Sequence, residues 1–106
     1  MATTFKPLDG VALGAGTATV FTAAVNNTVI TSLRALVPNA GTGGVTTIHR
    51  VPSSGSVSND TIIASDTLAA EEAIDLKNIF LDAGDTIRVV TAAAGPTVVS
   101  GNYSEP

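Results

Sequence analysis

The sequence predicts an all-β protein, an antiparallel β-sandwich of the jelly-roll type with seven or eight short strands. Three observations support this fold class. Valine, isoleucine and threonine dominate the segments between turns, and these residue types favour strands. Glycine, proline, asparagine and aspartate recur at short intervals, as turn residues do in sandwiches and barrels. No segment shows a strong helical pattern.

The length of the chain is that of one domain, since 106 residues can bury one modest core without disulfides or metals. We expect a polar N-terminal arm at residues 1–10 and a single β-sandwich domain at residues 11–106. Within GVALGAG, residues 10–16, we expect a short edge strand.

The next segment, residues 17–24, is expected to be a strand followed by a turn at residues 25–27. Successive side chains of a strand point to opposite faces. The alternation therefore groups Ala18, Val20 and Thr22 on one face, and Thr19 and Phe21 on the other.

Residues 28–37 form the longest expected strand, which Pro38 ends because proline cannot donate to a ladder of hydrogen bonds. A glycine-rich hairpin loop at residues 39–44 should return the chain, so that residues 45–51 pair back along this strand. An exposed polar loop follows at residues 52–60. The apolar face of the longest strand is expected to hold Val29, Leu33, Ala35 and Val37.

The stretch from residue 61 to residue 85 allows two interpretations. Helical spacing is approached by Leu68, Ala69, Ala73, Leu76 and Phe80, and Ala and Glu favour helix. Alternation around Ile74 and Leu76 favours strands instead, and we predict strands at residues 61–64 and 72–78. A tight turn at residues 81–85 then leads to a strand with Ile87 and Val89 inward. A turn at residues 93–96 and a last strand at residues 97–104 complete the fold.

Charge is unusually scarce in this chain. Charged residues make up 13% of the sequence, about half of the usual ~25%. A surface of Thr, Ser, Asn and Gly can be covered by a partner at little desolvation cost, so we expect a subunit with protein contacts. The net charge is −4 and the five basic residues are scattered, which disfavours nucleic acid as a direct partner.

The sequence offers no sign of secretion, membrane insertion or disulfide bonding. It has no cysteine, no charged and apolar leader pattern, and no apolar run near the ~20 residues that span a bilayer. We therefore expect synthesis in the cytoplasm of the host, with no membrane partner.

No catalytic, cofactor or metal constellation is apparent, so we predict that the protein is not an enzyme. His49, the single histidine, stands in a strand without a motif around it. An enzyme remains an alternative only if His49 is buried beside a carboxylate in a pocket. Asp82 and Asp85 suit a turn better than a calcium site, and Glu71 and Glu72, adjacent in sequence, cannot share a strand face.

Aromatic residues are too few to form a stacking stripe. Phe21 and Phe80 are expected in the core, whereas Phe5 in the polar arm is a candidate anchor for a neighbouring protein. The arm and the two polar loops are the expected contact regions. The candidate partner-binding residues are Phe5, Lys6, Asn39, Thr42, Ser53 and Ser56.

Three segments together resemble small structural proteins of tailed-bacteriophage particles. They are MATTFKPLDGVALG with the strand TATVFTAA, then TVITSLRALVPNAG, and finally FLDAGDTIRVVTAAAGPTVVSGNYSEP. The segment from Leu81 to Ile87 is the most specific of them. Such proteins often have a proline-glycine turn where this chain has Val25-Asn26-Asn27.

The resemblance implies a β-sandwich subunit of the virion and transfers no catalytic residues. The expected function is that of a capsid decoration (cement) protein, a homotrimer that bridges subunits of the major capsid protein. A neck, tail or head-fibre component is the alternative within the same class. A carbohydrate-binding module on a jelly-roll frame is the alternative from another class, although the chain has no Trp and a single Tyr to stack on sugars.

Overall fold

The computed structural model describes residues 4–13, 16–38, 43–92 and 97–106 and shows an all-β chain. Its one helical element among these residues is the 3₁₀ turn η1, Asn59–Thr61. The strands are β1 (Thr4–Leu13), β2 (Gly16–Thr22), β3 (Thr28–Leu36), β4 (Gly44–Val51), β5 (Ile62–Leu68), β6 (Ala73–Leu76), β7 (Ile79–Leu81), β8 (Thr86–Thr91) and β9 (Thr97–Glu105).

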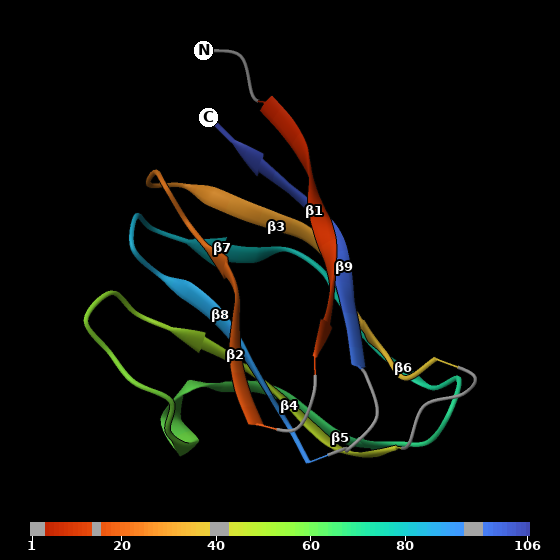
Figure 1. Cartoon of the computed structure of the whole chain (residues 1–106). Helices are drawn as coiled ribbons and strands as arrows, with labels where there is room; N and C mark the ends of the chain where they lie inside the picture. The colour runs from red at the N-terminus through yellow and green to blue at the C-terminus, as the bar shows by residue number, and fades with distance from the viewer. Residues whose placement is uncertain (1–3, 14–15, 39–42, 93–96) are drawn as a thin grey trace.

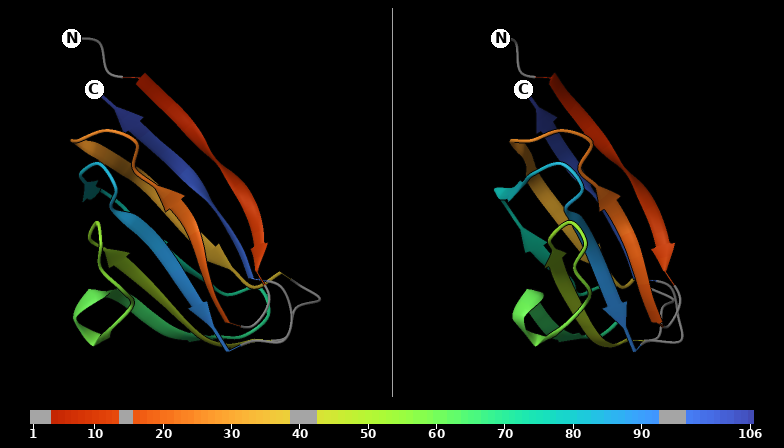
Figure 2. Two further views of the ribbon diagram at one scale, coloured as in Figure 1. Left: turned by 60° about the vertical axis from the view of Figure 1, so that its left-hand side comes forward. Right: turned by 90° about the vertical axis from the view of Figure 1, so that its left-hand side faces the viewer.

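The strands form two antiparallel sheets packed face to face (Figures 1 and 2). The first sheet has the order β1-β9-β3-β6, with β7 continuing beside β3 where β6 ends. The second sheet has the order β2-β8-β4-β5. Apart from the steps β4 to β5 and β6 to β7, each strand is followed by one in the opposite sheet. This interleaving is the connectivity of a jelly roll, so the predicted fold class is confirmed.

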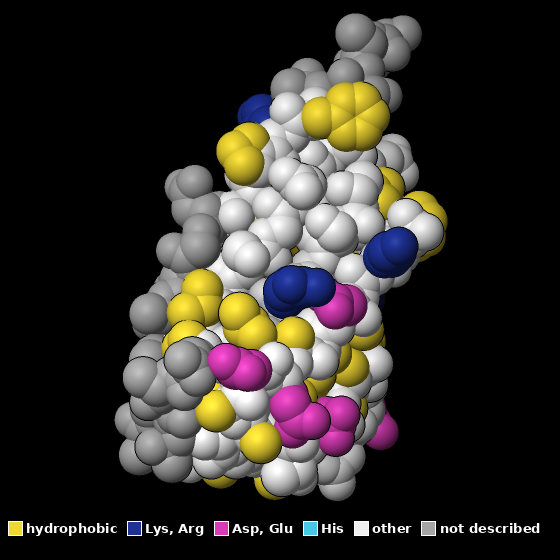
Figure 3. Space-filling view, turned by 90° about the vertical axis from the view of Figure 1, so that its right-hand side faces the viewer, with side chains coloured by type: hydrophobic (Ala, Val, Ile, Leu, Met, Phe, Trp, Pro, Cys, Tyr) yellow, Lys and Arg dark blue, Asp and Glu magenta, His cyan; other side chains and the backbone are white. Residues whose placement is uncertain are grey.

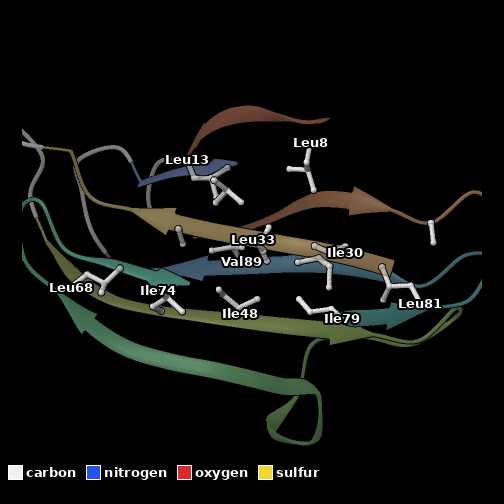
Figure 4. Packing of buried hydrophobic residues seen from close by; sticks show 14 of the residues in the cluster. Leu8, Leu13, Ile30, Leu33, Ile48, Leu68, Ile74, Ile79, Leu81 and Val89 are labelled. Atoms are coloured by element: carbon white, nitrogen blue, oxygen red, sulfur yellow. The ribbon is translucent and has the colours of Figure 1, made fainter. Parts of the chain in front are cut away.

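The core lies between the two sheets (Figure 4). Ile30 and Leu33 of the first sheet face Ile48 and Val89 of the second, and all four side chains are at most 1% exposed. Full burial of one such side chain stabilises the fold by roughly 1.5–3 kcal/mol. Ile87 and Val89 point inward as predicted. The other buried members of the cluster are Leu8, Leu13, Ala23, Ala35, Val37, Leu68, Ile74, Ile79, Leu81, Ile87 and Val99.

The inward face of β3 differs from the prediction in its first half. The register against β9 shifts between Ile30 and Ser32, so one extra residue is accommodated in β3. Such a shift reverses the alternation of inward and outward side chains. Ile30 is therefore fully buried, whereas Val29, predicted to share a face with Leu33, is only half-buried.

A second register shift, between Thr19 and Phe21, affects β2. Val20 and Phe21 both pack against the core, although strict alternation predicts opposite faces for them. Phe21 lies against Tyr103, with 4.6 Å between the ring centroids. The prediction that Phe21 belongs to the core is correct, and the predicted grouping of faces in this strand is wrong.

Residues 4–10 do not form a free arm. They belong to β1, which pairs with β9 from Thr4↔Glu105 to Leu13↔Thr97. Leu8 is buried in the core, and Lys6 Nζ lies 2.7 Å from Glu105 Oε1. The polar start of the chain is thus an edge strand of the first sheet, because its backbone pairs with the last strand of the chain.

The strand at residues 45–51 does not pair back along residues 28–37. It is β4, which lies between β5 and β8 in the second sheet. The connection from β3 therefore crosses between the sheets instead of closing a hairpin, and its residues 39–42 lie outside the described residues, as do residues 93–96.

The ambiguous stretch is built of strands, as predicted. β5 extends over Ile62–Leu68 and β6 over Ala73–Leu76, while Ala69–Glu72 forms a turn in which Glu71 has φ +70°. The Glu72 carboxylate accepts a hydrogen bond from the Ala69 backbone within this turn. The short strand β7 was not predicted as a separate element.

Candidate protein-contact surface

His49 is buried on the outer side of the second sheet, beneath the loop that leads to β5. It is 4% exposed, and its Nδ1 lies 2.8 Å from the Thr61 hydroxyl, not beside a carboxylate. None of the three described hollows is lined by His49. The condition for a catalytic histidine is therefore not met among the described residues, and the side chain holds the loop against β4.

Burial lowers the pKa of His49, and a hydrogen bond with the Ser58 backbone opposes this effect. The unfolded chain then binds a proton more readily than the folded one. The contribution of His49 to the free energy of unfolding is therefore fully present above the ordinary His pKa of 6.5 and decreases as the pH falls below it.

We predict that His49→Gln flattens this pH dependence between pH 7 and pH 5. The slope contributed by one group is at most about 1.4 kcal/mol per pH unit. Urea unfolding of both proteins at several pH values measures the difference between their slopes. Parallel curves for the two proteins would contradict the role assigned to His49.

The turn at residues 82–85 uses its acidic residues for structure. Asp85 is buried, and its carboxylate accepts hydrogen bonds from the backbone of Ser53 and of Asp82 and from the guanidinium of Arg50, at 2.9–3.0 Å. Asp82 accepts from the Asn27 backbone at 3.4 Å. Among the described residues, no group of three acidic, His or Cys side chains is placed to hold a metal ion.

Exposed phenyl rings stand on the outer face of the first sheet. The strand register places Phe5 opposite Ser104, Ser104 opposite Val29, and Val29 opposite Phe80. Directly paired residues share one face of a sheet, so these four side chains form a row across β1, β9, β3 and β7. Phe5 is 74% exposed and Phe80 67% exposed. We call these four residues the phenyl row.

The surroundings of the phenyl row are weakly charged. Figure 3 shows uncharged polar side chains and backbone over the upper part of this face, with a basic group near its top edge, and hydrophobic and charged side chains over its middle and lower part. The exposed ion pair of Arg34 with Asp75, at 2.7 Å, lies on this sheet. A hollow of about 690 Å³ with a mixed polar and apolar lining adjoins the pair and includes Lys77 and Asn102. The face can thus be covered with little loss of charge solvation.

Two hollows border Phe80 at the edge of the sandwich. The larger, about 500 Å³, reaches from Phe80 and Ile79 to Ile63 of β5, with Lys77 at its margin. The smaller, about 270 Å³, lies between Phe80 and Asn27. Arg50 lines both, and its Nε donates to the Phe80 carbonyl at 2.8 Å while its Nη2 lies 3.0 Å from Asp85. The Asp85 carboxylate, which holds the loop at Ser53, therefore also helps to fix β7 at Phe80 through Arg50.

The residues predicted to contact partners are not gathered on one surface. Phe5 is in the phenyl row, and Lys6 is beside it in β1 but is paired with Glu105. Ser53 and Ser56 are exposed in the connection between β4 and β5, and the backbone of Ser53 is held by Asp85. Asn39 and Thr42 lie outside the described residues.

Phe80 is an exposed aromatic residue that the sequence analysis placed wrongly. It was predicted in the core, and the structure exposes it instead. Its neighbours Ile79 and Leu81 are buried, so the alternation of a three-residue strand turns Phe80 outward. The predicted strand ended at residue 78, so the alternation of the separate strand β7 was not applied to Phe80.

Fold and surface together define a small jelly-roll sandwich with two exposed phenyl rings on the outer face of its first sheet. No known protein family matches the chain, and no curated protein matches it. No helix in the described part of the chain has the length and apolar character needed to cross a membrane.

Solved structures do resemble the chain. One comes from a study describing Bacillus endospore appendages as a family of disulfide-linked pili, with a TM-score of 0.63 and 18% identity over 97% of this chain and 84% of that chain. A chain of infectious bursal disease virus, Gx strain, has a TM-score of 0.41 and 15% identity over 98% of this chain and 33% of its own. The first similarity shows a shared fold.

Proposed function

We propose that the protein is a structural subunit of a virion, a capsid decoration protein that bridges subunits of the major capsid protein. The observation that carries this proposal is the phenyl row, in which two rings are more than half exposed on a weakly charged sheet face. Solvated rings of this kind are characteristic of surfaces that another protein covers. The resemblance of the sequence to phage structural proteins supports a tailed-phage particle as the assembly.

A decoration protein stabilises a capsid shell by thermodynamic linkage between its binding and shell assembly. A protein that binds the assembled shell and not its dissociated subunits shifts the equilibrium toward the shell by mass action. Each contact can be of ordinary size, about 800 Å² per partner, because repetition over the lattice adds avidity. The chemistry required is apolar contact, which the exposed rings of Phe5 and Phe80 offer without a cofactor.

Counting this polypeptide in purified particles by mass spectrometry tests the proposal. A decoration protein is expected in a number that scales with the lattice positions of the capsid. The copy number of a single ring would favour a neck, tail or head-fibre component instead. Absence from the particle would reject a virion role altogether.

The binding of the isolated protein to undecorated shells gives a direct prediction. We expect Phe80→Asp to weaken this binding at least tenfold, because the charge would be buried against an apolar partner. Val45→Asp is the matched control, since Val45 is 47% exposed on the second sheet. Co-sedimentation of shells with each variant measures the effect, and equal loss for both variants would contradict the assignment of this face.

A pilus-like subunit is the second candidate, favoured by the fold shared with the endospore-appendage structure. Cross-links of the kind named for that structure cannot form here, because the chain has no cysteine. Copies would have to be held by non-covalent contacts. Electron microscopy of the purified protein distinguishes the candidates, since filaments without any capsid present would favour this one.

A carbohydrate-binding module is less well supported. The single tyrosine, Tyr103, packs against Phe21 and the core, and it is therefore not free to stack flat on a sugar ring. A glycan array would test this alternative directly.

A further inference from the structure

The hollow of about 690 Å³ on the outer face of the first sheet lies between two rows of paired side chains. In one row Ser32 of β3 is opposite Asn102 of β9. In the other row Arg34 of β3 is opposite Ser100 of β9 on one side and Asp75 of β6 on the other. Directly paired residues share one face of a sheet, so the polar groups of both rows border the same hollow.

Two cations and one carboxylate line this hollow. The Arg34 guanidinium donates to the Asp75 carboxylate through Nε at 2.7 Å and Nη2 at 3.3 Å. The hydrogen bond from Arg34 lowers the pKa of the Asp75 carboxyl most, and the charge of Lys77, which also lines the hollow, lowers it further. The charged groups of the lining therefore sum to +1, whereas the whole chain carries −4.

Hydrogen-bond donors are in excess in the hollow. A guanidinium has five N–H groups, and the pair with Asp75 uses two of those of Arg34. Lys77 is exposed and takes part in none of the three ion pairs of the described residues, so its three N–H donors face solvent. The Asn102 amide donates to the Ser32 hydroxyl only at 3.4 Å. Such a lining suits a group that only accepts hydrogen bonds.

We propose that this hollow binds a carboxylate side chain, aspartate or glutamate, of the capsid subunit that covers the phenyl row. This inference rests on the proposed function and names the chemistry of the partner's surface. Charge complementarity selects the occupant, because an ionised carboxylate is a pure acceptor that matches a donor-rich lining with a charge of +1. The size is sufficient, because a cavity of about 150 Å³ already accepts a benzene ring.

The spacing of the strands defines what the partner segment needs. Along β9 the outward side chains are Ser104 in the phenyl row, then Asn102 and Ser100 beside the hollow. Two residues of a strand span about 7 Å, so the hollow extends over about 7–14 Å from the phenyl row. An extended partner segment lying along β9 would therefore place an apolar side chain on the phenyl row and an acidic one two to four residues further along.

The carboxylate contributes specificity more than affinity. The side chains of Arg34 and Asp75 are 56% and 55% exposed, so water screens charges at this site. An exposed ion pair changes an affinity by at most about fivefold. The apolar phenyl row therefore supplies most of the affinity, and the hollow sets the register of the partner.

Two substitutions with opposite expected effects on binding to undecorated shells test the proposal. Lys77→Gln removes a cation and should weaken binding about two- to fivefold. Asp75→Asn removes the competing carboxylate and leaves the Arg34 donors to the partner, so it should strengthen binding by a similar factor. The matched controls are Arg88→Gln and Asp66→Asn, which change the net charge equally on the second sheet and should leave binding unchanged. Weakening by both hollow variants, or effects equal to those of the controls, would overturn the proposal.

A peptide titration of the isolated protein followed by NMR tests the hollow without a capsid. We expect acetyl-Phe-Gly-Glu-amide at millimolar concentration to shift the backbone amide signals of Ser32, Gly101 and Lys77. Acetyl-Phe-Gly-Gln-amide should shift them much less, and Lys77→Gln should reduce the response to the glutamate peptide. Equal responses to the two peptides, or none, would overturn the carboxylate site.

The two experiments separate failure of the site from failure of the proposed function. Shells that bind the wild type while the hollow variants match their controls would leave decoration standing and remove the carboxylate site. Shells that do not bind the wild type, together with a response to the glutamate peptide alone, would remove decoration and leave the site.

Discussion

Replacing Gly101 with alanine is expected to destabilise the protein by about 3 kcal/mol, at the upper end of the usual cost of overpacking. Gly101 lies in β9 between Leu33 of β3 and Leu8 of β1. A Cβ atom there would meet the Ser32 carbonyl oxygen closer than any real contact and the Leu33 Cα at 3.1 Å. Both obstacles are backbone, so neither can rotate away, and the strands must separate.

The position of Gly101 coincides with irregularities on both neighbouring strands. β3 shifts register between Ile30 and Ser32, and β1 between Leu8 and Val11. A glycine in a strand interior often marks such a close approach of backbones. The phenyl row begins a few residues along the same strands, so distortion here should also weaken association of the protein with its partner.

Thermal unfolding followed by circular dichroism measures the effect. A loss of about 3 kcal/mol corresponds to a decrease in Tm of roughly 12–24 °C for a domain near this size. Ser100→Ala is the control, because Ser100 is the half-buried neighbour in the same strand and its change should stay within about 0.5 kcal/mol. A Gly101→Ala protein as stable as the wild type would show that β3 and β9 can move apart here without loss of stability.

Asp85→Ala is expected to lower the free energy of unfolding by about 3 kcal/mol as well, because it leaves three hydrogen-bond donors without their acceptor. Two are the backbone N–H groups of Ser53 and Asp82, and the third is the Arg50 guanidinium. Removing one partner of a buried, hydrogen-bonded charge pair typically costs 3–5 kcal/mol, and Arg50 is partly solvated, which places the value near about 3 kcal/mol. Urea unfolding at pH 7 measures it.

Asp82→Ala is the matched control within the same turn. Asp82 is exposed, and its carboxylate accepts one long hydrogen bond, so we expect a loss below about 1 kcal/mol. Equal losses for the two variants would mean that the turn backbone, not the Asp85 carboxylate, organises this end of the sandwich. Because Arg50 also holds the Phe80 carbonyl, Asp85→Ala should in addition release Arg50 from its position beside Phe80.

The pH dependence of the Asp85 contribution follows from its environment. The hydrogen bond from the Asp82 backbone lowers the pKa of Asp85 below 3.8, supported by the Ser53 backbone and Arg50 and opposed by burial. A lowered carboxyl pKa gives stability that is present above 3.8 and is lost as the pH falls through the folded-state value. The difference in unfolding free energy between the wild type and Asp85→Ala should therefore narrow as the pH falls below 3.8.

Local patterns predicted much of the architecture. The alternation of Ile87 and Val89 located β8 and its inward face, and the Asp-Ala-Gly-Asp spacing of residues 82–85 identified the turn before it. Both depend on residues close in sequence, whose conformational preferences act wherever the segment lies. The candidate contact residue Phe5 was found in this way too, because an apolar side chain in a polar segment is conspicuous.

The predictions were wrong where pairing with a strand distant in sequence determines the conformation of a segment. The register shift in β3 depends on its match to β9, some seventy residues later, and it buried Ile30 in place of Val29. Because residues 4–10 pair with β9, they form part of β1 instead of the expected arm. Phe80 was misplaced because the short strand β7 owes its existence to pairing with β3, and short strands have little propensity signal of their own.

By itself the sequence determined the composition of the surface and the class of the fold. Scarce charge, abundant β-branched residues and frequent turn residues act locally, and they permit little other than a sandwich of short strands. Only the tertiary structure decided which strands are neighbours, and therefore which side chains share a face. The phenyl row exists because Phe5, Ser104, Val29 and Phe80, far apart along the chain, meet in one register across four strands. Hydrogen bonding between strands sets that register, and no single segment contains the information for it.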